Sequence, residues 1–162
     1  MGMLNRACMN VYSLSSKKLT AIPRDLPSIM GESNVRMGLV QRLDLSNNTI
    51  ASLEPLPLEE MDSLKELLVR QNRIRELPHQ RLNRCKQLRL LNAEWNEVNV
   101  VPPLYRLAFL FLRHNDVKLV TSELKGLKLQ GITLDWLQYL IEVEEDHPGS
   151  PSEEFGSHVQ AY

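Results

Sequence analysis

One pattern of apolar residues with a single asparagine recurs along the chain at an interval too long for one helix or strand. It is clearest between Val40 and Leu53, where Leu43-Asp44-Leu45 alternates as a short strand would and Asn48 then marks a turn. The asparagine position returns at 17, 48, 72, 96 and 115, so successive repeats begin 31, 24, 24 and 19 residues apart. Self-similarity at such an interval is typical of a solenoid.

The repeats agree at several positions in register. The regular ones are Val40, Leu43, Leu45, Asn48, Ile50, Leu53; Leu64, Leu67, Val69, Asn72, Ile74, Leu77; Leu88, Leu91, Ala93, Asn96, Val98, Val101; and Leu107, Leu110, Leu112, Asn115, Val117, Val120. A degenerate first repeat runs from Met9 to Pro23 with Lys17 in place of asparagine. This pattern resembles the intracellular, 24-residue-type leucine-rich repeat family over roughly two thirds of the chain. The resemblance implies a right-handed α/β solenoid of about five repeats with a parallel sheet on its concave face.

Length and pattern predict one domain with short ends. We expect a lead-in at 1–8, a repeat domain at 9–145 whose last part, about 121–145, is a C-terminal helical cap, and a disordered tail at 146–162. The cap helix is expected from Gly131 to Val143 with Thr133 as N-cap. Trp136 would pack on the last repeat or, alternatively, anchor a partner. The extra length at 24–39 reads as a surface insertion rather than a binding loop.

Charge and cysteine content narrow the classes of partner and the compartment. A formal net charge of −1 gives no global field toward nucleic acid or an anionic membrane. No apolar run is long enough to span a membrane, and the first residues lack a signal core. Cys8 and Cys85 read as free thiols in packed positions, without the cysteine-rich caps usual in extracellular members of the family. The sequence therefore predicts a cytoplasmic protein, with a nuclear or ciliary location as alternatives.

Residue patterns that would support catalysis or cofactor binding do not occur in this sequence. The seven glycines are scattered and form no phosphate-binding loop, and the four histidines and two cysteines lack metal-ligand spacing. Pairs such as Glu59-Glu60 read as solvated faces, and no nucleophile motif is present. We therefore expect no enzyme activity, no cofactor and no metal.

The recurring asparagines have an expected structural role. After each strand the chain turns sharply and leaves backbone groups unpaired inside, and an inward amide can both donate and accept hydrogen bonds. The structural asparagine ladder is expected to comprise Asn48, Asn72, Asn96 and Asn115.

Residues between and beside the inward leucines should face the concave surface, because strand side chains alternate. This surface is small and polar in the first repeats and aromatic in the last ones, where two of the three phenylalanines lie. An apolar area with aromatic members and arginines at its rim has the composition of a binding hot spot. The predicted partner-binding residues are Arg42, Asp44, Glu66, Leu68, Arg70, Leu90, Asn92, Glu94, Trp95, Phe109, Phe111 and Arg113.

Function follows from this surface and from the family resemblance. The resemblance implies a non-enzymatic protein-interaction module, acting as an adaptor, scaffold or regulatory subunit. The alternative is an architectural subunit of a large assembly such as an axonemal or ribonucleoprotein complex. A second alternative is that the C-terminal segment folds back over Phe109 and Phe111. RNA binding is not expected, since Arg42, Arg70 and Arg113 alternate with acidic residues.

Overall fold

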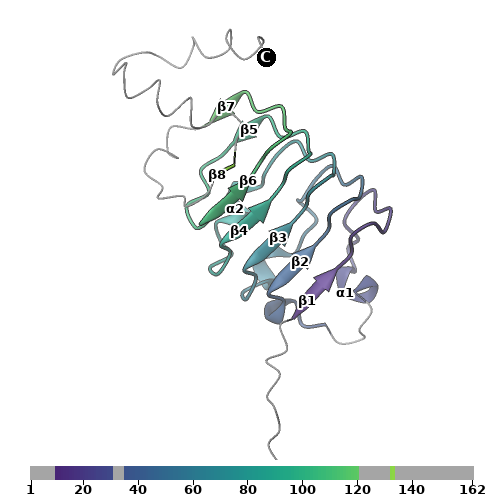
Figure 1. Cartoon of the computed structure of the whole chain (residues 1–162). Helices are drawn as coiled ribbons and strands as arrows, with labels where there is room; N and C mark the ends of the chain where they lie inside the picture. Colours follow the sequence, from purple (N-terminus) through teal and green to yellow (C-terminus); the bar gives the residue numbers. More distant parts are fainter. Residues whose placement is uncertain (1–9, 31–34, 121–131, 134–162) are drawn as a thin grey trace, which may run out of the picture.

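The computed structural model describes residues 10–30, 35–120 and 132–133. Within them, a row of short parallel strands lies side by side along the solenoid axis (Figure 1). The sheet has the order β1-β2-β3-β4-β6-β8. Its strands are β1 (Val11–Ser13), β2 (Arg42–Asp44), β3 (Glu66–Leu68), β4 (Leu90–Asn92), β6 (Phe109–Phe111) and β8 (Ile132–Thr133). The predicted parallel sheet is confirmed.

Adjacent strands pair without any shift in register. Tyr12 aligns with Leu43, and Leu43, Leu67, Leu91 and Leu110 then align in turn. These four leucines are fully buried. Because strand side chains alternate, the residues on either side of each leucine lie on the opposite, outward face.

Each strand ends in a turn of the same backbone conformation. The residue just before the asparagine position has a positive φ of 53° to 58° in every repeat, a left-handed conformation that most side chains disfavour. These residues are Ser16, Asn47, Gln71, Trp95 and His114. The turn directs the chain from the sheet toward the opposite face of the solenoid.

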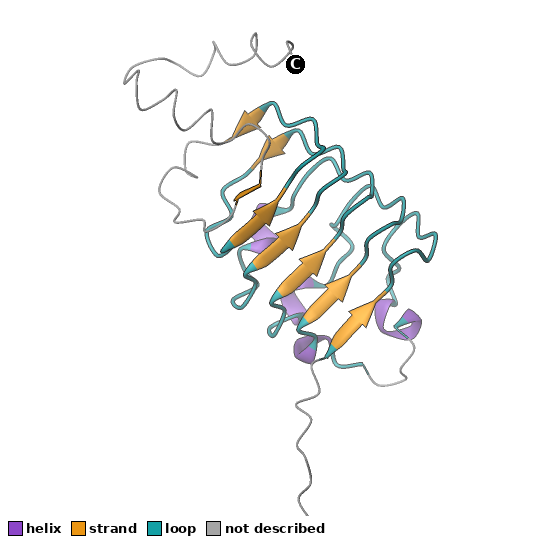
Figure 2. Ribbon diagram, viewed as in Figure 1, coloured by secondary structure: helices purple, strands orange, loops and turns teal. Residues whose placement is uncertain are grey.

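Short helices rather than long ones form the opposite, convex face (Figure 2). They are α1 (Leu26–Ile29), η1 (Met37–Leu39), η2 (Leu58–Glu60) and α2 (His79–Leu82). Pro57 and Pro78 directly precede η2 and α2, where a missing N–H costs nothing. Leu26 and Met37 are buried, so the 24–39 insertion contributes to the core and does not merely bulge from it.

The repeat after Asn96 has no helix on the convex face. Its shorter length leaves room only for β5 (Val100–Val101), which pairs in parallel with β7 (Leu119–Val120) in a second, two-stranded sheet. Asn83, directly after α2, hydrogen-bonds to the segment 103–105 of the next connection. Its side chain donates to the Pro103 carbonyl at 2.8 Å and accepts from the Tyr105 N–H at 3.0 Å.

The structure describes two residues of the expected C-terminal cap. Ile132 and Thr133 form β8 beside β6, with Phe111 aligned to Thr133. The sequence analysis did not predict this strand, and the helix expected after Thr133 lies outside the described residues. The lead-in at 1–8, Cys8, most of the expected cap with Trp136, and the tail at 146–162 lie outside the described residues. None of the described helices is long and apolar enough to cross a membrane.

Candidate functional site

The pairing register places the outward residues of the sheet in two rows across the strands. One row consists of Val11, Arg42, Glu66, Leu90 and Phe109, and the other of Ser13, Asp44, Leu68, Asn92 and Phe111. Neighbouring strands lie about 5 Å apart, so side chains adjacent in a row are within contact range. Eight of the residues predicted to bind a partner therefore share one face of one sheet.

Apolar side chains gather at the β3–β6 end of this face. We call Leu68, Leu90, Phe109 and Phe111 the apolar patch. Phe109 is 39% exposed, and the other three are partly exposed. Leu90 and Phe109 are direct neighbours, whereas Asn92 separates Leu68 from Phe111 in their row. A face that leaves two phenylalanines in contact with water is unusual unless another molecule covers it.

Trp95 extends the aromatic area onto the turns that follow the strands. It is 46% exposed, and its ring stacks on His114 with centroids 3.8 Å apart and planes inclined by 23°. Both residues have positive φ, a conformation that asparagine and histidine tolerate better than tryptophan. The sequence contained this aromatic pair at one repeat position, but its stacking could not be deduced without the turn geometry.

The N-terminal half of the face is polar, and its charged side chains are paired with other groups of the protein. Arg42 and Glu66 form an ion pair at 3.0 Å across β2 and β3. The Asp44 carboxylate accepts from the Ser46 N–H at 2.9 Å. Asp44 therefore stabilises its own turn, a role that the sequence analysis missed although Asp-x-Ser is a turn signal.

The remaining predicted residues lie where the strands pass into the turns. The Asn92 amide oxygen accepts from the Glu94 N–H at 3.1 Å, just as the Asp44 carboxylate, two strands earlier in the same row, accepts from the Ser46 N–H. Arg70 and Arg113 are exposed on the turns after β3 and β6, and Glu94, on the turn after β4 between them, is partly exposed. These residues form a mixed-charge border on the strand-end side of the apolar patch.

The recurring asparagines connect each turn to the repeat before it. The Asn72 amide oxygen accepts from the Ile50 N–H at 3.0 Å, and its nitrogen donates to the carbonyls of Leu45 and Val69, each at 3.0 Å. Asn48, Asn96 and Asn115 repeat this arrangement. Asn48 also bonds the Leu19 N–H, so it holds the first turn, where Lys17 stands in place of asparagine.

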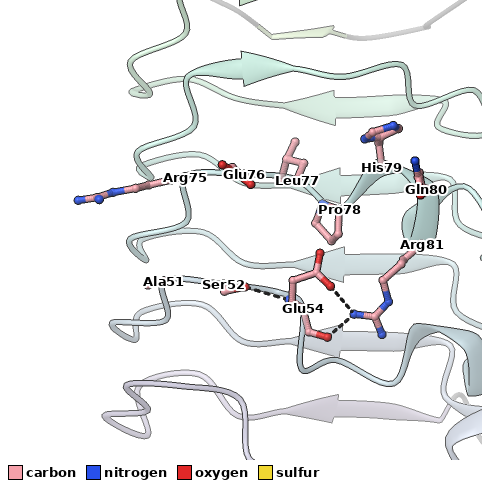
Figure 3. Close-up of a pocket in the computed structure, with 10 residues that line it drawn as sticks. All are labelled: Ala51, Ser52, Glu54, Arg75, Glu76, Leu77, Pro78, His79, Gln80 and Arg81. Atoms are coloured by element: carbon pink, nitrogen blue, oxygen red, sulfur yellow. Dashed lines mark hydrogen bonds and ion pairs between the residues drawn. The ribbon is translucent and has the colours of Figure 1, made fainter.

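A depression of about 470 Å³ is lined by Ala51, Ser52, Glu54 and residues 75–81, on the connections that follow two successive turns (Figure 3). Arg81 fills one side of it and binds both oxygens of Glu59 at 2.8 Å, the Glu54 carboxylate at 3.2 Å and the Leu56 carbonyl at 2.5 Å. Hydrogen bonds from Arg81 lower the pKa of Glu59 to about 2. Glu59 is thus ion-paired and not simply a solvated residue, and Arg81 links two repeats.

Cys85 lies in the core beside the Leu58 carbonyl and is 2% exposed. Burial raises the pKa of this thiol to about 11, so it is protonated near neutral pH. In the described ranges no three His, Cys, Asp or Glu side chains converge as metal ligands would. In the depression the Ser52 hydroxyl accepts from the Glu54 N–H at 3.1 Å, and no hydrogen bond of the described residues joins it to His79.

Comparison with known proteins identifies the class. Residues 39–98, from the end of η1 to just beyond the turn after β4, match the family model described as leucine rich repeat. Residues 39–98 are therefore leucine-rich repeats, as the sequence pattern predicted, and proteins with such repeats generally bind other proteins. A search of curated proteins found no match. Among solved structures, the chain is similar to an internalin (inlF) from Listeria monocytogenes, at 19% identity with a TM-score of 0.45. That match covers 60% of this chain and 36% of the internalin.

Proposed function

We propose that this protein is a non-enzymatic interaction module whose concave sheet face binds another protein, with the apolar patch and the Trp95–His114 pair as its energetic centre. The observation that carries the proposal is the solvent exposure of aromatic rings on a paired sheet, with Phe109 39% and Trp95 46% exposed. Burying such rings against a partner supplies most of the free energy in typical protein interfaces.

The polar half of the face supports the same conclusion by contrast. Arg42 is paired with Glu66, and Asp44 is engaged with its own turn, so this end has fewer groups available for a partner. The patch, in contrast, has apolar area that only a partner or another segment can remove from water. An adaptor, scaffold or regulatory subunit would use such a face. A cytoplasmic location, consistent with the reduced Cys85 thiol in the core, is part of the proposal.

Affinity purification after in-cell cross-linking tests the proposal, with the wild type and Phe111→Asp compared in parallel. We expect a dominant partner that is lost in the variant, because a charge at the centre of an apolar contact must be desolvated. Val100→Asp is the matched control: Val100 is 38% exposed in β5, outside the concave sheet. Equal far-UV circular dichroism shows that both variants are folded. Retention of the same partners by folded Phe111→Asp contradicts the proposal.

Size-exclusion chromatography of the protein produced alone addresses the architectural alternative. A free adaptor stays monodisperse in size-exclusion chromatography without its partner. A fixed assembly subunit would instead be recovered only in one large complex and would aggregate when produced alone.

A further inference from the structure

The charges that border the apolar patch indicate what kind of segment it binds. Four exposed basic residues stand where the strands begin, and we call Lys65, Lys86, Arg89 and Arg106 the basic rim. Lys65 and Arg89 directly precede β3 and β4, and Arg106 lies three residues before β6. The basic rim therefore runs along one side of the patch.

Backbone hydrogen bonds fix the basic rim against the patch. The Arg89 carbonyl accepts from the N–H groups of Ala108 and Phe109 at 2.8 and 2.9 Å, and the Lys65 carbonyl accepts from the Leu90 N–H at 3.1 Å. The backbones of Lys65 and Arg89 thus each lie one strand, about 5 Å, from a patch residue. This distance is shorter than the Debye length of about 8 Å at physiological salt, so the rim charges act on whatever covers the patch.

The described structure does not neutralise these charges. The Arg89 guanidinium donates to the carbonyls of Lys86 and Arg106 at 3.2 and 3.4 Å, and the Arg106 side chain donates to the Asn83 carbonyl at 2.8 Å. These acceptors are neutral, and in the described part of the chain no rim residue has a carboxylate within ion-pair distance. Residues 81–93 and 101–115 contain no Asp or Glu at all.

The other side of the face differs in charge. On the strand-end turns, Glu94 is partly exposed, Glu97 pairs with Arg75 at 2.9 Å, and Lys118 pairs with Asp116 at 3.2 Å. Next to the first member of the rim, Lys65, lies Glu66, whose carboxylate is ion-paired with Arg42 at 3.0 Å, and Asp62 lies three residues before Lys65. The face is therefore positive on one side and mixed on the other.

We propose that the apolar patch binds an acidic peptide segment of another protein, with apolar or aromatic side chains on the patch and carboxylates along the basic rim. This inference rests on the proposed function and specifies the chemistry of its partner. Complementary charge of this kind steers association and selects among partners. RNA fits less well, because a single-strand site needs a continuous basic groove, whereas Asp44 and Glu94 lie on this face.

A random peptide library displayed on phage and panned against the full chain gives the first test. The enriched peptides should combine Asp or Glu with Phe, Trp or Leu. One enriched peptide is then synthesised and titrated against the wild type, Phe111→Asp and the double variant Lys65→Glu/Lys86→Glu, which leaves the Arg89 and Arg106 hydrogen bonds intact. Lys17→Glu/Arg73→Glu is the matched control, because it makes the same charge change on the strand-end side.

We expect the Lys65→Glu/Lys86→Glu variant to bind about tenfold more weakly in low salt, with the difference shrinking as salt rises, and the control to bind like the wild type. Phe111→Asp should abolish binding. Peptides without acidic bias, no enrichment at all, or an unchanged Kd in the Lys65→Glu/Lys86→Glu variant overturn the inference. If Phe111→Asp still abolishes binding in that case, the proposed function stands. Peptide binding that survives Phe111→Asp overturns both.

The same titration also tests two other molecules that could cover the apolar patch, namely RNA and an acidic stretch of the chain itself. An oligouridylate that binds the wild type more tightly than the peptide, and is lost in the rim variant, assigns the surface to RNA and overturns the inference. The chain itself has an acidic apolar stretch at 134–146, whose acidic residues are Asp135, Glu142, Glu144, Glu145 and Asp146. In a variant with all five changed to Asn or Gln, this stretch would compete less for the patch if it occupies the patch in the wild type. A higher affinity of that variant for the peptide therefore assigns the patch to this stretch and overturns the proposal of a separate partner.

Discussion

Replacing Asn72 with alanine should destabilise the solenoid more than any surface substitution, and the structure gives the size of the effect. The substitution removes the acceptor of the Ile50 N–H, a buried group with no other acceptor among the hydrogen bonds of the described residues. A buried donor left unsatisfied costs about 1–3 kcal/mol. The Leu45 and Val69 carbonyls lose less, because each keeps a bond from the adjacent asparagine, Asn48 at 2.8 Å and Asn96 at 2.9 Å.

These contributions predict a loss of about 2–3 kcal/mol in the free energy of unfolding for Asn72→Ala. Urea denaturation followed by far-UV circular dichroism measures it, with coincidence of a second probe as the test of two-state behaviour. Asn99→Ala is the control, because Asn99 is an exposed asparagine of the same solenoid and should change stability by less than about 0.5 kcal/mol. A change in Asn72→Ala no larger than in the control would refute the ladder as a source of stability.

Three further predictions concern the aromatic pair, the convex ion pair and the core thiol. Trp95→Asn should leave stability within about 1 kcal/mol in urea denaturation, because relief of the positive φ offsets the lost stacking on His114, while it reduces partner capture. The Glu59 pKa of about 2 lies below the ordinary glutamate value of 4.5, chiefly because Arg81 hydrogen-bonds the carboxylate. The pair therefore stabilises the fold above about pH 4.5, and this contribution is lost as pH falls toward 2. Because Glu59 is 44% exposed, we expect only about 0.5–1 kcal/mol, seen as a shrinking difference in Tm between the wild type and Glu59→Gln on acidification; a constant difference contradicts it. In a Cys8→Ser background, Cys85 should react with a thiol reagent at pH about 8 only after unfolding, since burial holds its pKa near 11; rapid labelling of the native chain would show that the core opens.

The repeat pattern was sufficient to predict the register of the sheet. Leu43, Leu67 and Leu91 align as expected because repeats of equal length place equivalent residues side by side. The pattern also separated inward from outward residues, since a strand side chain can only take one of two faces. The outward position of Phe109 and Phe111 follows from this alternation alone.

Side-chain contacts between repeats could not be predicted from the repeat pattern. Arg81 reaches Glu54 and Glu59, which lie 27 and 22 residues earlier, and nothing local in the sequence selects these carboxylates. The basic rim is likewise spread over three repeats whose charges alternate with apolar residues along the chain. The strand at Ile132–Thr133 was missed because a two-residue strand has too little periodicity to compete with an adjacent helical pattern.

Site-specific photo-cross-linking in cells tests the central claim, binding through the concave face, most directly. A photoreactive phenylalanine analogue replaces Phe109 in one variant and Val100 in another, so that each probe lies at an exposed apolar position of a different sheet. The account predicts a cross-linked partner from position 109 and none from position 100. Cross-links from position 100 alone, with position 109 silent in a folded and expressed chain, would contradict it.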